Sequence, residues 1–184
     1  MLRDASEVSG VVVLQTVAHR DDRGYLVETW REERCRAAGI DARFVQDNLS
    51  VSRRGVLRGL HFQHPAPQGK LVYVLQGSIW DVGVDLRRGS PTFGDHVAVE
   101  LSAGNGLQVF LPEGMAHGFY VTSDSALVAY KCTATYQPGS DRGLRWDDPA
   151  LGIAWPEGLR TLSPKDAALP LLTEISSEDL VEWT

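Results

Sequence analysis

Two stretches of the sequence concentrate side chains that can move protons or bind oxygen atoms. The first contains Arg58, His61 and Lys70, and the second ends on His117. An imidazole can accept a proton near neutral pH, and guanidinium and ammonium groups donate hydrogen bonds to phosphate and carbonyl oxygens. These residue types together predict a pocket for an anionic or carbonyl-bearing organic ligand.

The second stretch also has a spacing that is typical of cupin barrels. Gly106, Pro112, Gly114 and His117 follow the pattern G-x5-P-x-G-x2-H. The first stretch resembles, in outline, the other cupin motif, in which two histidines and a glutamate bind a metal ion. The two motifs predict an all-β fold, the double-stranded β-helix or cupin jelly roll, with a few short peripheral helices.

Lys70 stands where metal-binding cupins place their glutamate. An ammonium group has three donors and no lone pair, so it cannot coordinate a cation. Its charge beside a metal ion would be repelled strongly in a partly dry barrel. We therefore predict neither a metal nor a cofactor. A metal-dependent cupin using His61, His64 and His117 remains the alternative.

The elements that must position these residues are mainly short strands. Runs of β-forming residues separated by turn-forming residues, at intervals of roughly 8–12 positions, are typical of a sandwich or barrel. Short helices are expected at 31–38, ending at Gly39, and at 177–183, capped by Ser177. The expected strands are Val11–Val17, Leu71–Leu75, Ser78–Val84, His96–Leu101, Leu107–Leu111, Gly118–Val121 and Ala126–Thr133.

Length and composition indicate one globular domain over residues 1–184, with 43% hydrophobic and 23% charged residues. We expect the barrel at about 45–136, a segment at about 1–45 that contributes to a dimer, and a segment at about 137–184 that packs on the barrel. A net charge of -6 without a basic stripe argues against nucleic-acid binding. Without a long apolar run or a leader pattern, a cytoplasmic protein with no membrane contact is expected.

The chain resembles the dTDP-4-dehydrorhamnose 3,5-epimerase family from about residue 11 to about residue 170. Each matching segment is weak alone, but the whole set in this order is specific for the family. The segments are Asp22-Arg-Gly-Tyr-Leu-Val-Glu28, Gln46-Asp-Asn-Leu-Ser50, Gly55-Val-Leu-Arg-Gly-Leu-His-Phe-Gln63, Gln68-Gly-Lys70, Asp81-Val-Gly-Val-Asp-Leu-Arg87, Ser90-Pro-Thr-Phe-Gly94, Ala116-His-Gly-Phe119, Tyr130-Lys131, Trp146-Asp-Asp-Pro149 and Leu162-Ser-Pro-Lys-Asp166.

The resemblance implies proton abstraction next to a carbonyl group, in which a base on one face of a 4-keto sugar and an acid on the other invert a carbon. It implies that His61 is the base, that Asp166 is the carboxylate behind it, and that Tyr130 is the proton donor. A phenol is protonated at neutral pH and can donate. Lys70 is implied to stabilise the enolate oxygen or to seat the sugar.

The family also implies which residues bind the nucleotide sugar, a dTDP-4-keto-6-deoxyhexose. Arg58 suits the diphosphate because a guanidinium grips phosphate oxygens with two parallel hydrogen bonds. Arg23 and Glu28 lie in an N-terminal segment that reaches the neighbouring subunit's site in a homodimer. Asp141 stands where the family usually has glutamate. His117 is implied to hydrogen-bond the substrate near the carbonyl, and the remaining implied contacts are Gln46, Asn48, Tyr136 and Lys165.

The resemblance predicts inversion of both C3 and C5 of dTDP-4-dehydro-6-deoxy-D-glucose. Single-site epimerases of related deoxysugar pathways share these residues, so inversion of one carbon is the alternative. A sugar-binding cupin without activity is a further alternative, which the base and acid residues disfavour.

Overall fold

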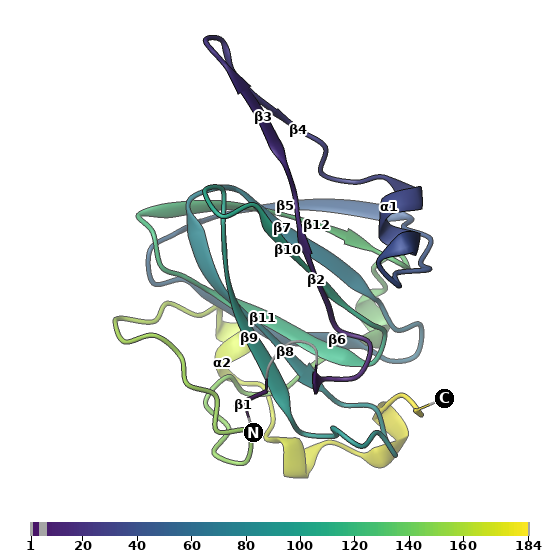
Figure 1. Ribbon diagram of the computed structural model, residues 1–184. Coiled ribbons are helices and arrows are strands. Elements are labelled where there is room, and N and C mark those ends of the chain that lie inside the picture. Colours follow the sequence, from purple (N-terminus) through teal and green to yellow (C-terminus); the bar gives the residue numbers. More distant parts are fainter. Residues whose placement is uncertain (1, 4–6, 184) are drawn as a thin grey trace.

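The computed structural model describes residues 2–3 and 7–183, most of which form β-strands (Figure 1). Each predicted strand is present, and β10 has the predicted bounds, whereas β1, the β3–β4 hairpin, β5, β6 and β13 are additional. The strands are β1 (Leu2–Arg3), β2 (Val12–Gln15), β3 (Ala18–Asp21), β4 (Gly24–Val27), β5 (Gln46–Arg53), β6 (Leu57–Gln63), β7 (Lys70–Gln76), β8 (Ser78–Asp85), β9 (His96–Ser102), β10 (Leu107–Leu111), β11 (Met115–Val121), β12 (Ser125–Cys132) and β13 (Asp141–Gly143).

The strands form two stacked sheets and a separate hairpin. One sheet has the order β1-β9-β8-β11-β6-β13 and the other β2-β10-β7-β12-β5, and all of these pairs are antiparallel except β1 with β9. The β3–β4 hairpin projects away from both sheets (Figure 1). Because consecutive strands mostly alternate between the layers, residues far apart in sequence face each other across the interior.

The inward positions change from apolar to polar along single strands. Val72 and Val74 on β7, and Val128 on β12, belong to one buried apolar cluster between the sheets. Two positions before Val72 stands Lys70, and two after Val128 stands Tyr130. Residues two apart on a strand share a face, so the same inner faces provide a packed core at one end and polar groups at the other.

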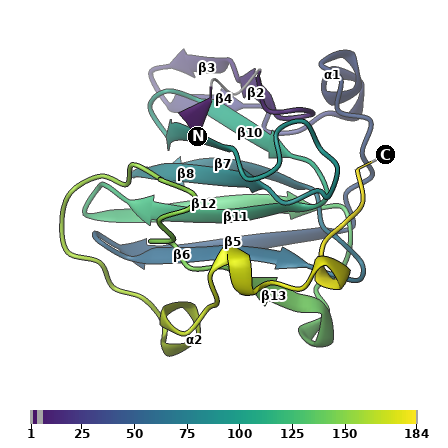
Figure 2. The same ribbon diagram turned by 90° about the horizontal axis from the view of Figure 1, so that it is seen from below.

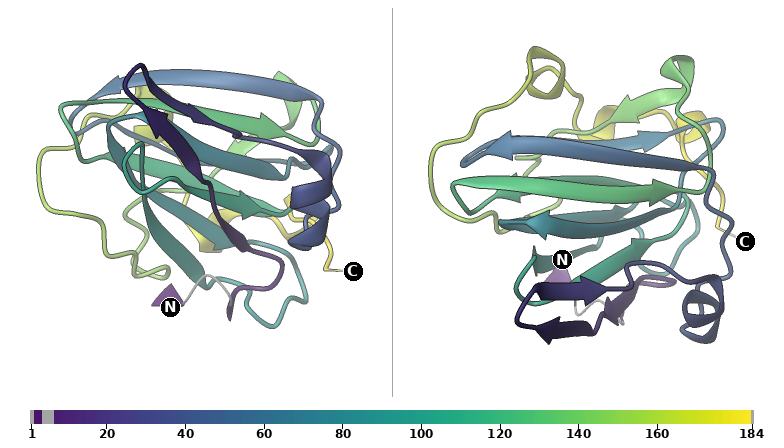
Figure 3. Two further views of the ribbon diagram at one scale, coloured as in Figure 1. Left: turned by 45° about the horizontal axis from the view of Figure 1, so that its top comes forward. Right: turned by 90° about the horizontal axis from the view of Figure 1, so that it is seen from above.

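The outer faces of the two sheets differ. Residues 144–180 pack on the sheet that contains β8 and β6, where Leu144, Leu151 and Leu180 are buried against Phe62 and Val82 (Figure 2). On the other sheet, α1 covers one end, and β5, β12 and β7 are seen uncovered from above (Figure 3).

The helices are short, as expected, but the C-terminal one differs from the prediction. The helices are α1 (Glu32–Ala37), α2 (Pro164–Ala167), η2 (Pro138–Ser140), η3 (Leu172–Glu174) and η4 (Ser177–Asp179). Ser176, and not Ser177, caps η4 by accepting from the Glu178 amide. The helix ends early because the chain turns extended at Leu180, and the Trp183 amide donates to the Arg88 carbonyl.

Among the described residues, no helix combines the length and hydropathy needed to span a bilayer.

Candidate active site

The polar ends of the strands surround a cavity of about 780 Å³ between the sheets. Eleven of the thirteen predicted site residues line it, although they come from β5, β6, β7, β11, β12, β13, α2 and a loop. These eleven are Gln46, Asn48, Arg58, His61, Lys70, His117, Tyr130, Tyr136, Asp141, Lys165 and Asp166.

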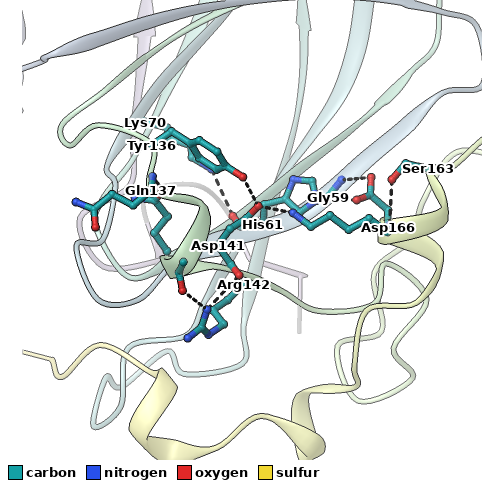
Figure 4. Close-up of polar contacts among 12 residues, drawn as sticks. Gly59, His61, Lys70, Tyr136, Gln137, Asp141, Arg142, Ser163 and Asp166 are labelled. Carbon is teal, nitrogen blue, oxygen red and sulfur yellow. Dashed lines mark hydrogen bonds and ion pairs between the residues drawn. The ribbon is translucent and has the colours of Figure 1, made fainter.

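His61 and Asp166 form a hydrogen-bonded pair in the cavity wall. The His61 Nε2 lies 2.8 Å from the Asp166 Oδ1 (Figure 4). Since an ionised carboxylate only accepts, it holds the ring proton on Nε2 and leaves the Nδ1 lone pair for a substrate proton. The Asp166 side chain is 6% exposed and that of His61 31%, so the base is reachable while its partner is shielded.

The local sequence Ser163-Pro-Lys-Asp166 positions this carboxylate. The Ser163 hydroxyl accepts from the Asp166 amide and caps α2, while Pro164 starts the helix. Because Ser163 performs the capping, the Asp166 side chain is free to bind His61 and the Gly59 amide. Burial alone would raise the pKa of Asp166, but the hydrogen bonds, led by that from His61, hold the pKa below its usual value.

Gly59 bends β6 so that Arg58 and His61 can both face the cavity although they are three positions apart. Its φ of 112° lies where side chains are rarely tolerated, and an added Cβ would approach the His117 carbonyl oxygen to 2.6 Å. The β6–β11 register also shifts near this bend. The Arg58 Nε donates to the Ser52 hydroxyl at 3.0 Å, which holds the guanidinium on the cavity wall.

Lys70 is buried at the inner end of the cavity, with its side chain over β6. Its Nζ donates to the His61 carbonyl oxygen at 3.4 Å. Burial lowers the pKa of Lys70, because an ammonium loses its hydration there, and nearby Asp81 and Asp141 partly oppose this. A developing enolate oxygen could therefore be stabilised by a donor that is poorly solvated beforehand.

Tyr130 lies on β12, in the sheet opposite His61. Burial raises the pKa of its phenol, so the group stays protonated and able to donate at neutral pH. Its ring centroid is 6.4 Å from that of His117. An imidazole and a phenol thus reach one cavity from different sheets.

Three side chains meet at the rim of the cavity. The Tyr136 hydroxyl donates to the Asp141 Oδ2 at 2.7 Å, and the Lys165 ammonium pairs with the same oxygen (Figure 4). Burial would raise the pKa of Asp141, but these two partners lower it overall. The shorter acid at this position is therefore ionised and still reached by Lys165.

The amides of Gln46 and Asn48 are also held in place. The Gln46 Nε2 donates to the Asn48 Oδ1 at 3.1 Å, and the Gln46 Oε1 accepts from the Tyr136 amide at 2.7 Å. The Asn48 Nδ2 lies 3.6 Å from the buried Cys132 Sγ. These contacts present two amide groups along the β5 edge of the cavity.

Arg23 and Glu28 do not line this cavity. Arg23 follows β3 at the tip of the hairpin and pairs with Asp21, while Glu28 follows β4 and pairs with Arg31. All four side chains are largely exposed.

The described residues contain no group of three or more His, Cys, Asp or Glu side chains placed to hold a metal ion. The Nε2 atoms of His61 and His117 bind carboxylates instead, and His64 does not line the cavity.

Asp81 is a site residue that the sequence analysis did not single out. Its Oδ1 lies 2.8 Å from the His117 Nε2, and it is 2% exposed. The available signal was an aspartate inside the apolar strand run Ser78–Val84, because a buried carboxylate requires a partner.

The arrangement fits general acid–base chemistry on an organic carbonyl compound: an oriented imidazole, a protonated phenol from the other sheet and a desolvated ammonium share one cavity. The fold and the site thus define an acid–base enzyme built on a cupin-like β-sandwich.

Comparison with known proteins identifies the family. The sequence model described as dTDP-4-dehydrorhamnose 3,5-epimerase matches residues 5–174. A dTDP-4-dehydrorhamnose 3,5-epimerase of Methanothermobacter thermautotrophicus is 50% identical over 151 residues, 82% of either chain. A dTDP-4-dehydrorhamnose 3-epimerase of Streptomyces niveus is 39% identical over 176 residues, covering 95% of this chain and 85% of its own.

A solved structure is also similar. The epimerase RmlC of Legionella pneumophila, in complex with dTDP-4-keto-L-rhamnose, has a TM-score of 0.94 and 47% identity, covering 97% of this chain and 96% of that one. This chain belongs to the dTDP-4-dehydrorhamnose 3,5-epimerase family. The predicted cupin fold and the predicted isomerase activity are thereby confirmed.

Proposed function

We propose that this enzyme inverts C3 and C5 of dTDP-4-dehydro-6-deoxy-D-glucose and produces dTDP-4-dehydro-L-rhamnose. The observation that carries the proposal is the His61–Asp166 pair, at 2.8 Å, in one cavity with the phenol of Tyr130 from the opposite sheet. Support for this substrate comes from the Legionella relative, whose complex contains dTDP-4-keto-L-rhamnose.

The residues divide the chemistry among themselves. The 4-keto group acidifies the C–H bonds at C3 and C5, and the Nδ1 of His61 removes one of these protons. The electron pair of the C–H bond moves onto the 4-keto oxygen, where Lys70 stabilises the enolate. Tyr130 then delivers a proton to the opposite face of the carbon. No net oxidation occurs, so the reaction as written needs no redox cofactor, and Lys70 provides the positive charge at the enolate oxygen.

The rim residues are proposed to bind the nucleotide. Arg58 binds the diphosphate and Tyr136 stacks on the base or sugar, while further hydrogen bonds come from the remaining polar side chains. Tyr136 is half exposed, which leaves its ring accessible to a flat partner. The other proposed nucleotide-sugar contacts are Gln46, Asn48, Asp141 and Lys165, with Arg23 and Glu28 from a second subunit, while His117 is proposed to hydrogen-bond the substrate near the carbonyl.

Proton NMR in heavy water tests the proposal. With dTDP-4-dehydro-6-deoxy-D-glucose as substrate, we expect solvent deuterium at both C3 and C5. Deuterium at C3 alone would instead identify the single-site alternative, which the similarity to the Streptomyces niveus 3-epimerase supports at lower identity. Binding without any exchange would overturn both assignments.

The enzyme is proposed to act as a homodimer. Burial alternates along β5: Gln46 and Asn48 are half-buried, whereas Leu49 and Val51, which also border the cavity, are 68% and 72% exposed on the other side of the strand. With Leu75 of β7, also exposed, they form an apolar face on the part of the sheet, β5, β12 and β7, that is uncovered in Figure 3. A second copy of the chain suits this face, because Arg23 and Glu28 need another subunit's cavity.

Replacing Leu75 by arginine is expected to convert the dimer to a monomer, because a charge would be buried within the proposed interface. Sedimentation equilibrium measures the mass. The matched control is Leu159→Arg, which changes a leucine that is 90% exposed on a different surface and should leave the mass unchanged. A Leu75→Arg protein with the mass of two chains would refute the proposed interface.

We also propose a cytoplasmic location. Cys35 and Cys132 are both buried free thiols, and such thiols suit a reducing compartment.

A further inference from the structure

His117 has a buried carboxylate of its own. The His117 Nε2 lies 2.8 Å from the Asp81 Oδ1, and the two side chains are 7% and 2% exposed. They come from adjacent strands, β11 and β8, whose register places Asp81 opposite Phe119. This pair has the same atoms and the same distance as His61 with Asp166, but it lies deeper in the molecule.

The two imidazoles are neighbours on one sheet. His117 is the direct cross-strand partner of His61, so both side chains line the same cavity wall. Their carboxylates approach from different elements, Asp166 from α2 and Asp81 from β8. The other polar groups that face His117 are Lys70 from β7 and Tyr130 from β12. Each ring therefore has a separate acceptor that can balance a positive charge.

The bond to Asp81 determines what His117 can offer a substrate. A carboxylate only accepts, so the Nε2 of His117 carries a proton and Nδ1 is the nitrogen left for a ligand. A keto or enolate oxygen also only accepts. A contact between that oxygen and Nδ1 therefore requires a second proton on the ring. An imidazolium buried to this degree needs a paired carboxylate, and Asp81 is that carboxylate.

We propose that Asp81 is a positioning residue of the epimerisation, which holds His117 as an imidazolium with Nδ1–H directed at the sugar's 4-keto oxygen. This inference rests on the proposed function. In the enolate, His117 and Lys70 then share the negative charge that forms when His61 removes the proton. Asp81 contacts no substrate atom itself, and it acts only through the ring of His117.

The variant Asp81→Asn removes the negative charge of the side chain at position 81 and keeps its shape. The asparagine Oδ1 can still accept from Nε2, but the neutral amide no longer stabilises an imidazolium. We expect kcat to fall by roughly 100-fold, the effect of losing one charged donor to an oxyanion, with a much smaller change in KM.

Asp85→Asn is the matched control, because Asp85 is on the same strand, is fully buried and pairs with Arg87 at 2.7 Å, away from the cavity. This control should lower the melting temperature without changing the kcat of the folded enzyme. A kcat loss of equal size in both variants would indicate a structural role for Asp81 and would overturn the proposal.

A second measurement uses the wild-type enzyme, so it does not depend on whether a variant folds. In the wild-type enzyme with its equilibrated keto-sugar substrate, nitrogen-15 NMR of the His117 ring should show protons on both nitrogens. An unprotonated Nδ1 in this complex would overturn the proposal. Deuterium exchange in the wild-type enzyme distinguishes failure of this inference from failure of the proposed function. If the wild-type enzyme exchanges deuterium and the Asp81→Asn variant has an unchanged kcat, only the role of Asp81 is wrong. If the wild-type enzyme shows no exchange, the proposed function is wrong.

Discussion

An enzyme with His61 replaced by asparagine is expected to lose solvent deuterium incorporation at both C3 and C5, with kcat lower by at least about 1,000-fold. One positioned base contributes roughly 100-fold to 10,000-fold, and the other imidazole that lines the described cavity, His117, is proposed to act as a donor and not as a base. The asparagine amide can still bond to Asp166, so the fold should be retained. Proton NMR in heavy water measures exchange at each carbon separately.

His64→Asn is the matched control for this variant, because His64 lies three positions further along the chain and does not line the cavity. It should keep the wild-type rates at both carbons. Loss of exchange at only one carbon in His61→Asn would mean that a second base serves the other carbon, and the proposal of one base for both would be wrong.

An enzyme with Tyr130 replaced by phenylalanine is expected to separate exchange from inversion. His61 can still remove a proton and return a deuteron to the same face, so deuterium enters without a change of configuration. Delivery to the opposite face loses its donor, and formation of the inverted product should fall by about 100-fold. Product configuration and deuterium content are measured in the same NMR experiment.

Tyr73→Phe is the control for Tyr130→Phe, because Tyr73 is a half-buried phenol on β7 that does not line the cavity. It should invert both carbons at the normal rate. If Tyr130→Phe also inverts them normally, another group supplies the proton and the assignment of the acid fails.

The sequence alone predicted the strands whose inward residues are apolar. β7, β10 and β12 contain such runs, and their inward valines belong to the core between the sheets, to which β8 adds Ile79. β5 was not predicted because its pattern is reversed: its half-buried positions are polar, and the apolar Leu49 and Val51 are its exposed positions. A strand with polar side chains toward a cavity and apolar side chains toward an outer face lacks the apolar inward positions from which a core strand is predicted.

The proximity of His61 to Asp166 follows from tertiary structure and not from local pattern. They are 105 positions apart, and the pair forms because α2 packs beside β6. Only the family resemblance suggested this pairing, since Asp166 by itself suits a helix start equally well. Lys70 is different, because its place within a cupin motif already indicated a buried ammonium, and the structure buries it.

A structure of the enzyme with a dTDP-linked 4-keto-6-deoxyhexose bound tests the central claim most directly. We predict that the sugar ring lies between the two sheets, with the His61 Nδ1 and the Tyr130 hydroxyl on opposite faces of the ring. Each should be within roughly 3–3.5 Å of a reacting carbon or its hydrogen. A sugar with both groups on one face, or with the Tyr130 hydroxyl turned away from the ring, would contradict it.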